Sequence, residues 1–377
     1  ESFDSELVEH WMEHASRRPW TEDEFPLLAA WLKEQQQPLK HVRAGAKNSR
    51  CYFPMIRLSP DDSMLELWIY YSPLRDAGTA LSIEAMQRLG RDENFHAWEN
   101  LKTALVVGFH SAEQPNLIGN LVGIGVSERA MYCLADVLHF AEYSKADLAR
   151  VANEFDQLPT LEPMAEEFRG GERMIALDVM SGHVSGLSSL SATGVRNPPW
   201  MFSVDVNLVL RQANEHFDRM EAAADATPGD ERMRLAAVAN EQIEETCINA
   251  VKRLTWFNKV LSRQARSEAV GNILCGLLLP GVQAATTVDD RYRVRRACAR
   301  AAIALAQYRA AHGEYPDKLA QLVPEFADQE PKDYFTGQPL KYVRTAEGYQ
   351  LYCVGPNGQD DGGLDATQDD ALDSNLH

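Results

Sequence analysis

The sequence lacks the short motifs that identify common nucleotide-binding, zinc-finger and disulfide-rich proteins. None of its six cysteines belongs to a CxxC pair, and it has no P-loop and no GxGxxG stretch. Scattered cysteines fit neither a Cys-based zinc site nor a dense disulfide framework, so we expect buried thiols. The missing glycine-rich loops argue against a common nucleotide site. The cysteines are Cys51, Cys133, Cys247, Cys275, Cys298 and Cys353.

Positive charge is scarce relative to negative charge. The 377 residues include 37 Lys and Arg against 55 Asp and Glu, which gives a formal net charge of −18. A protein that binds nucleic acid needs a positive field to attract the phosphates, so we expect that this acidic protein binds no nucleic acid. The partner that we expect is a protein. Hydrophobic residues make up 45% of the chain, which is too many for a disordered protein and enough for more than one core.

No apolar run in the sequence reaches the length that a transmembrane helix needs. The longest, residues 270–285, is broken by Pro280 and Gly281 and is shorter than the ~20 residues that span a bilayer. We therefore expect no transmembrane segment. The sequence begins with Glu1 rather than Met, so we expect that something upstream was cut away, by a protease or in cloning, and a lost signal peptide or membrane anchor is one alternative.

Helical spacing of apolar residues dominates residues 1–290, which we predict to form a helical domain of stacked or bundled helices with a sub-boundary near 150–200. Gly and Pro separate the helical stretches. Three glycines, Gly119, Gly123 and Gly125, lie inside one of them, and close helix packing would offset their cost of about 1 kcal/mol each. The predicted helices are 26–32, 74–89, 95–109, 117–143, 161–168, 172–187, 204–224, 230–261 and 291–311.

The pattern changes after the last of these helices. A short helix is predicted at 318–323, and alternating residues predict strands at 339–344 and 348–354 that form a hairpin. A long helix followed by a small antiparallel sheet is an α+β module. The expected fold class is therefore mainly α, with a small C-terminal α+β module at residues 291–377.

The acidic, turn-rich loop after the hairpin predicts a calcium site. Calcium takes six to eight oxygen ligands from carboxylates, amides and carbonyls, and glycines let the chain wrap closely around it. The loop is not an EF-hand, because Gln368 stands where that motif needs a bidentate Glu. The alternative is a solvated acidic tail. The candidate ligands are Asn357, Gln359, Asp360, Asp361, Asp365, Asp369 and Asp370.

A second candidate site lies near the N-terminus. His10, Glu13 and His14 match the H-x-x-E-H pattern, in which two histidines on one helix face bind zinc and the Glu acts as general base. This pattern predicts a zinc-dependent hydrolase as the alternative function. The competing interpretation is a solvent-facing helix, which we favour, so a non-catalytic protein is the leading expectation.

Five arginines on the predicted helix 291–311 form a third feature. At 100° per residue they spread around more than one helix face, which predicts salt bridges to acidic residues rather than one anion groove. A partner-binding stripe is the alternative. They are Arg291, Arg293, Arg295, Arg296 and Arg300.

Short segments in the last quarter of the chain occur in a characteristic order. They are the helix end and Tyr-Pro turn at 306–316, the short helix at 319–323, the Asp-Tyr-Phe loop at 333–342, the strand at 348–352 and the Val-Gly-Pro-Asn-Gly turn at 354–358. In this order they resemble the globular domain of the major pseudopilins of type II secretion. The resemblance implies a calcium loop, with Asn357, Asp369 and Asp370 as side-chain ligands.

The chain also departs from that family. A pseudopilin begins with a long apolar helix followed directly by this domain, whereas about 290 helical residues precede it here. The whole chain is similar in layout to large uncharacterised bacterial proteins with a helical N-terminal region and a pseudopilin-like end. We therefore expect a structural or protein-binding protein of the cell envelope or periplasm, with the cytoplasm as the alternative location.

Overall fold

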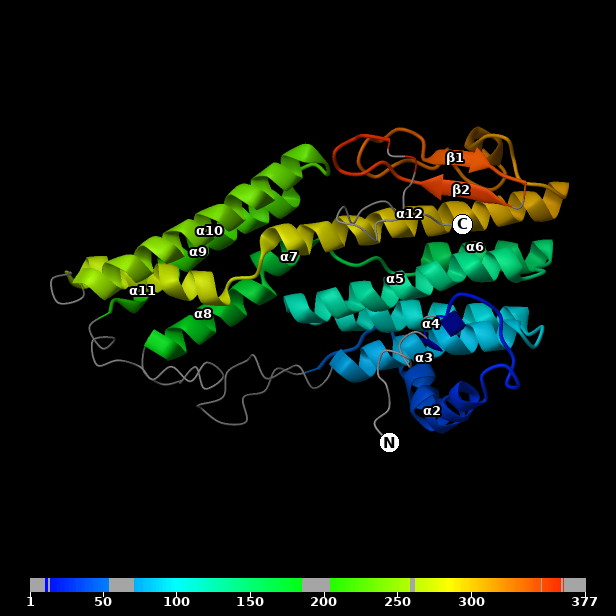
Figure 1. Cartoon of the computed structure of the whole chain (residues 1–377), viewed down its shortest axis with the longest axis horizontal. Coiled ribbons are helices and arrows are strands. Elements are labelled where there is room, and N and C mark those ends of the chain that lie inside the picture. The colour runs from blue at the N-terminus through cyan, green and yellow to red at the C-terminus, as the bar shows by residue number, and fades with distance from the viewer. Residues whose placement is uncertain are drawn as a thin grey trace.

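The computed structural model describes residues 11–12, 14–53, 71–184, 204–257, 262–346, 348–360 and 362, and the structural statements below refer to these residues. The fold is mainly α, as the sequence predicts, with one small antiparallel sheet near the C-terminus (Figure 1). The helices are α2 (Pro26–Gly45), α3 (Tyr71–Leu89), α4 (Asn94–Ala112), α5 (Leu117–Phe140), α6 (Lys145–Gln157), α7 (Met164–Arg169), α8 (Gly171–Val184), α9 (Val206–Asp225), α10 (Asp230–Phe257), α11 (Arg263–Leu278) and α12 (Val282–His312).

Helices α3, α4 and α5 form the centre of one packed body, with α2 and α6 at its sides (Figure 1). Glycines allow α4 and α5 to approach closely: a Cβ atom on Gly123 would lie 2.4 Å from the carbonyl oxygen of Gly108. A Cβ on Gly119 would likewise lie 2.8 Å from the Ser111 carbonyl oxygen. The predicted close packing is therefore confirmed for these two glycines, whereas Gly125 faces open space and the prediction is wrong there.

Helices α8, α9, α10 and α11 form an arm with a second apolar core (Figure 1). Two of these helices also reach the core of the body. Helix α9 contributes Val209 to the core of the arm and Phe217 to the core of the body. Helix α10 likewise contributes Ala250 to the core of the arm and Ile243 to the core of the body. The arm is therefore joined to the body by continuous helices rather than by a loop alone.

Helix α12 runs along the body and packs against α5, α6 and α10. It contains the predicted helix 291–311 but begins earlier, at Val282. Within Arg263–His312, one apolar window of 18 residues has a mean hydropathy of 1.4 and passes the length and composition test for a membrane span, which the sequence prediction did not anticipate. Because 44% of that apolar window is buried in the fold and core helices of soluble proteins pass the same test, it is weak evidence for a span.

The C-terminal module, residues 313–362, covers one side of α12. It contains the short 3₁₀ helix η4 (Leu319–Leu322) and a hairpin of β1 (Lys341–Arg344) and β2 (Tyr349–Tyr352). The strands are antiparallel, with Lys341 opposite Tyr352. The predicted hairpin is thus confirmed.

Candidate functional site

The predicted calcium loop directly follows β2, and its described candidate ligands are exposed. Asn357, Gln359 and Asp360 lie on the surface of the C-terminal module. The other four candidates, Asp361, Asp365, Asp369 and Asp370, lie outside the described residues. Within the described part of the chain, no group of three or more His, Cys, Asp or Glu side chains is placed to hold a metal ion.

Asp360 already has a cationic partner. One carboxylate oxygen lies 2.9 Å from Lys341 Nζ, and the other accepts hydrogen bonds from the Tyr352 hydroxyl at 2.9 Å and from the Gly362 amide at 3.2 Å. The hydrogen bond from Lys341, followed by that from Tyr352, lowers the pKa of Asp360. Because both oxygens are engaged, Asp360 fits an anchor between the loop and β1 better than a calcium ligand.

Asn357 and Gln359 fit an oxygen-rich cation site better. The Asn357 side-chain oxygen accepts a hydrogen bond from the Gln359 backbone amide at 3.0 Å, which shapes the turn and leaves this oxygen a second lone pair. Two exposed amide oxygens and nearby backbone carbonyls suit Ca²⁺. They supply no negative charge, so the carboxylates of a site would have to come from residues 361–370.

Asp333 is a buried residue of the C-terminal module to which the sequence analysis gave no role. It is 3% exposed, and one carboxylate oxygen accepts hydrogen bonds from the amides of Phe335 at 2.8 Å and Thr336 at 3.0 Å. The other oxygen accepts from the Val354 amide at 2.7 Å. One buried carboxylate therefore ties the turn before β1 to the chain just after β2. The Asp-x-x-x-Gly turn pattern gave a local signal, but its contact with Val354 depends on the fold.

A buried ion cluster, here called the Arg232 cluster, joins three parts of the molecule. Arg232 on α10 contacts Asp290 and lies 3.0 Å from Asp289, both on α12, and it donates a hydrogen bond to the Tyr334 hydroxyl at 3.2 Å. Arg293 completes the cluster, 3.0 Å from Asp289. Burial raises the pKa of Asp290 to about 6, against the attraction of Arg232. The cluster connects the arm, α12 and the C-terminal module.

The arginines of α12 form separate contacts rather than one stripe, as the spread of their positions predicts. Arg291 donates two hydrogen bonds to Glu128, and Arg300 donates one to Asp156 at 2.7 Å. Arg296 donates to the Leu158 carbonyl oxygen. The buried guanidinium of Arg295 lies 3.4 Å from the centre of the Tyr132 ring. The salt-bridge interpretation is confirmed for Arg291, Arg293 and Arg300.

The H-x-x-E-H pattern is only partly within the described residues, since His10 and Glu13 lie outside them. His14 is exposed, and its Nδ1 atom accepts a hydrogen bond from Arg18 Nε at 3.1 Å. That bond occupies one of the two ring nitrogens with which His14 could bind zinc. The predicted zinc pair therefore stays a prediction.

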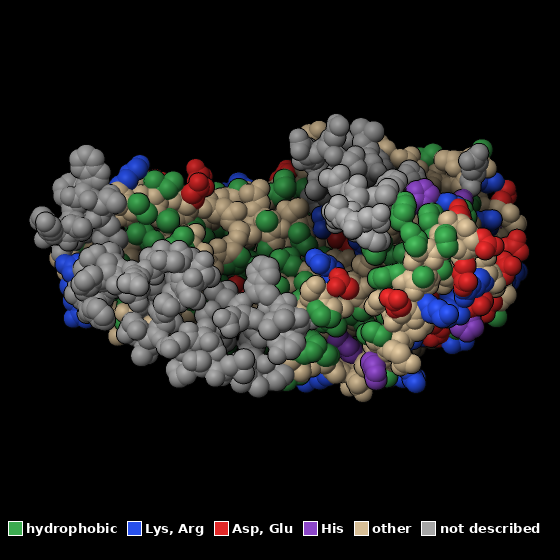
Figure 2. Space-filling model, turned by 60° about the horizontal axis from the view of Figure 1, so that its bottom comes forward, with side chains coloured by type: hydrophobic (Ala, Val, Ile, Leu, Met, Phe, Trp, Pro, Cys, Tyr) green, Lys and Arg blue, Asp and Glu red, His purple; other side chains and the backbone are tan. Residues whose placement is uncertain are grey.

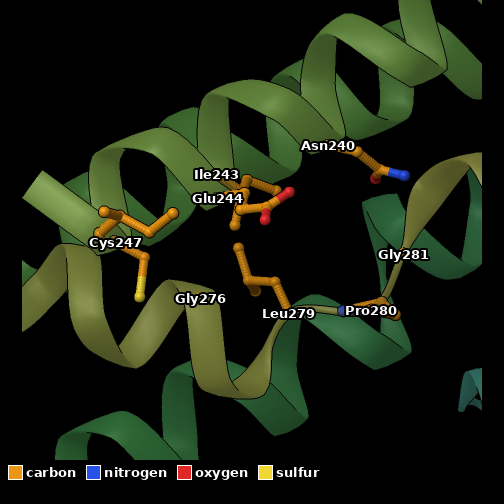
Figure 3. Close-up of a pocket in the computed structure, with 9 residues that line it drawn as sticks. Asn240, Ile243, Glu244, Cys247, Gly276, Leu279, Pro280 and Gly281 are labelled. Carbon is orange, nitrogen blue, oxygen red and sulfur yellow. The ribbon is translucent and has the colours of Figure 1, made fainter.

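An open groove lies where α11 turns into α12, at the junction of the two cores. Its volume is ≈ 330 Å³, and the side chains of Glu244 and Leu279 point toward each other across it (Figure 3). Gly276 brings α11 close to α10, because a Cβ there would lie 2.4 Å from the Cys247 sulfur. The lining residues are Asn240, Ile243, Glu244, Cys247, Ile248, Gly276, Leu279, Pro280 and Gly281.

Exposed apolar side chains accompany the groove, and the sequence analysis did not identify them. The lining residue Ile248 is 45% exposed to water, and Val251 on the next turn of α10 is 44% exposed. No motif marks this site, because it depends on how α10 and α11 pack. In contrast, Lys and Arg side chains are mixed with Asp and Glu across the right-hand part of the face in Figure 2.

Comparison with known proteins adds no family assignment. No protein-family model, curated protein or solved structure matches the chain significantly.

Proposed function

We propose that this chain is a structural, protein-binding protein of the cell envelope whose groove at the α10–α11 junction receives a basic, amphipathic segment of a protein partner. The observation that supports this proposal most strongly is the groove itself, which combines an apolar lining with the carboxylate of Glu244. The C-terminal module serves as a second, structural element that covers α12.

The apolar part of the groove suits the hydrocarbon stem of a Lys or Arg side chain. Long basic side chains place their methylene groups on apolar surface while the charged end seeks a carboxylate or water. Ile243 and Leu279 provide such a surface beside Glu244. Ile248, a lining residue that is 45% exposed, adds apolar surface that an amphipathic helix bound in a groove could cover.

The charge at the groove favours a basic partner. Glu244 lines the groove and is exposed, and it forms no ion pair with another side chain of the described residues. Glu231, near the start of the same helix, is instead paired with Arg234. A carboxylate without an ion pair in an apolar groove attracts a cationic side chain and speeds its association.

Calcium belongs to this proposal as a stabiliser of the C-terminal module. Asn357 and Gln359 would supply amide oxygens, and Asp361, Asp365, Asp369 and Asp370 would supply charge, while Asp360 stays on Lys341. Bound Ca²⁺ would neutralise clustered carboxylates and stabilise the native loop. The pseudopilin resemblance and the exposed amide oxygens support this part of the proposal.

Site-specific photo-crosslinking in cells of the source organism tests the docking proposal. A photoreactive amino acid at Ile248, beside the groove, is compared with one at Leu27, an exposed apolar side chain on α2. We expect a crosslinked protein with a basic amphipathic segment from position 248 and a weaker or absent product from position 27. Equal crosslinking to the same proteins from both positions, or none from position 248, contradicts the proposal.

A further inference from the structure

Two cysteines meet where the C-terminal module rests on α12. Cys298 lies on α12, and Cys353 is the first residue after β2. Both are 0% exposed and belong to the same apolar core. The Cys298 side chain is the first cause of the raised pKa of Cys353, so the two thiols are neighbours although the residues are far apart in sequence.

The surrounding contacts hold these two elements together in a fixed geometry. The Tyr315 and Tyr349 rings meet edge to face with their centres 4.9 Å apart, and Arg309 on α12 donates a hydrogen bond to the Tyr315 hydroxyl. On the other side, Asp333 binds the Val354 amide, next to Cys353. The backbone on either side of the thiol pair is therefore fixed by several independent contacts.

We propose that Cys298 and Cys353 form a disulfide bond when the chain folds in an oxidising compartment, and that this bond locks the C-terminal module onto α12. The oxidant is a disulfide of the thiol–disulfide exchange class. One cysteine thiolate attacks it, forms a mixed disulfide and releases one thiol. The second cysteine thiolate then displaces the other thiol. Two protons and two electrons leave the pair, and the oxidant disulfide becomes two thiols.

Burial determines when the bond forms. The hydrogen bond to Cys298 and burial raise the pKa of Cys353, so the closed fold holds little of the reactive thiolate. Oxidation therefore takes place before the module closes over α12. Once closed, the same burial shields the bond from soluble reductants.

The other cysteines provide internal comparisons. Cys133 is buried on α5 and donates a hydrogen bond to the Ser82 carbonyl oxygen. Cys247 on α10 and Cys275 on α11 also lie near each other. The Cys247 sulfur occupies the space beside Gly276, where a Cβ atom would lie 2.4 Å from it. This second pair is the competing site of oxidation, and its linkage is a distinct outcome of the test.

The test uses the full chain, unfolded with reductant and refolded in a mixture of reduced and oxidised glutathione. After alkylation of the remaining thiols and digestion, mass spectrometry maps the links. We expect two of the six thiols to be lost, a peptide pair joining Cys298 to Cys353, and a melting temperature a few degrees above that of the reduced protein. Cys298→Ala should abolish the link, and Cys133→Ala should leave it intact.

Six alkylated thiols after refolding would overturn the proposal, and so would a link confined to Cys247 and Cys275. The wild-type peptide map decides the question even where a variant fails to fold. The result does not depend on the groove, because a chain without a docking partner can still form this bond.

Discussion

The guanidinium of Arg232 carries the positive charge on which two buried carboxylates depend. Arg232 is 3% exposed, Asp289 is 1% exposed and Asp290 is 3% exposed. A buried ion pair adds little net stability compared with apolar residues of the same size, but removal of one partner leaves a buried charge without compensation. Arg232 is therefore a residue at which a small change should have a large effect.

We expect Arg232→Met to lower the free energy of unfolding by about 3–5 kcal/mol, because Asp290 loses its ion-pair partner and Asp289 keeps only Arg293. Arg234→Met is the matched control, since that exposed pair with Glu231 is screened by water and contributes little to stability. Denaturant unfolding measures both variants. Equal stability of the two would contradict the structural role of the cluster.

Glu167 on α7 is a buried carboxylate with no ion-pair partner in the described part of the chain. It is 7% exposed, and burial raises its pKa to about 7, with Glu172, Glu162 and Glu166 adding repulsion. The folded pKa lies above the unfolded value, so the folded state binds the proton more tightly. The contribution of Glu167 to stability is therefore greatest at low pH and falls as the pH rises from about 4.5 to about 7.

Glu167→Gln should remove this pH dependence, because the amide never ionises. Relative to wild type, the variant should gain roughly 3 kcal/mol of stability on going from pH 4.5 to pH 8, the order expected from a pKa shift of this size. Glu325→Gln, at an exposed site of the C-terminal module that does not act on Glu167, should leave the dependence unchanged. Melting temperatures across pH 4–8 measure both, and a wild-type-like profile in Glu167→Gln would refute the assignment.

At the scale of elements, local sequence patterns predicted the long helix α12 and the hairpin, because each has its own periodicity and turn residues. The pattern for α6 was present but missed: Ser144 and Asp147 form a capping box, followed by Leu148, Val151 and Phe155 on the buried face. The pairing of Lys341 with Asp360 could not be read from the sequence, since it depends on strand register. The groove likewise depends on the contact between Gly276 and Cys247.

The loop after β2 gives a prediction at this scale. Scanning calorimetry of the protein after EDTA treatment should show a higher melting temperature once about 5 mM Ca²⁺ is added, because Ca²⁺ binds the native loop and not the unfolded chain. Asp369→Asn with Asp370→Asn should abolish the response, and Asp328→Asn, at an exposed site elsewhere in the module, should preserve it. An unchanged melting temperature on Ca²⁺ addition would eliminate the calcium site.

At the scale of the whole molecule, two apolar cores share α9 and α10, and the groove lies at their junction. The net charge of −18 does not by itself locate a binding site, because much of the surface pairs acids with arginines. Glu244, which lines the groove and forms no ion pair among the described residues, is more informative than the total. The position of the groove between the cores also means that a bound segment would contact α10, α11 and the start of α12 together.

The most direct test of the docking proposal is the yield of the crosslink from Ile248 after charge reversal at the groove. In a Glu244→Lys background we expect the yield to fall about tenfold, the equivalent of about 1.4 kcal/mol, because a like charge would face the partner's basic side chain. Glu215→Lys, at an exposed site on α9, should leave the yield unchanged. Equal yields in the two backgrounds would contradict the account.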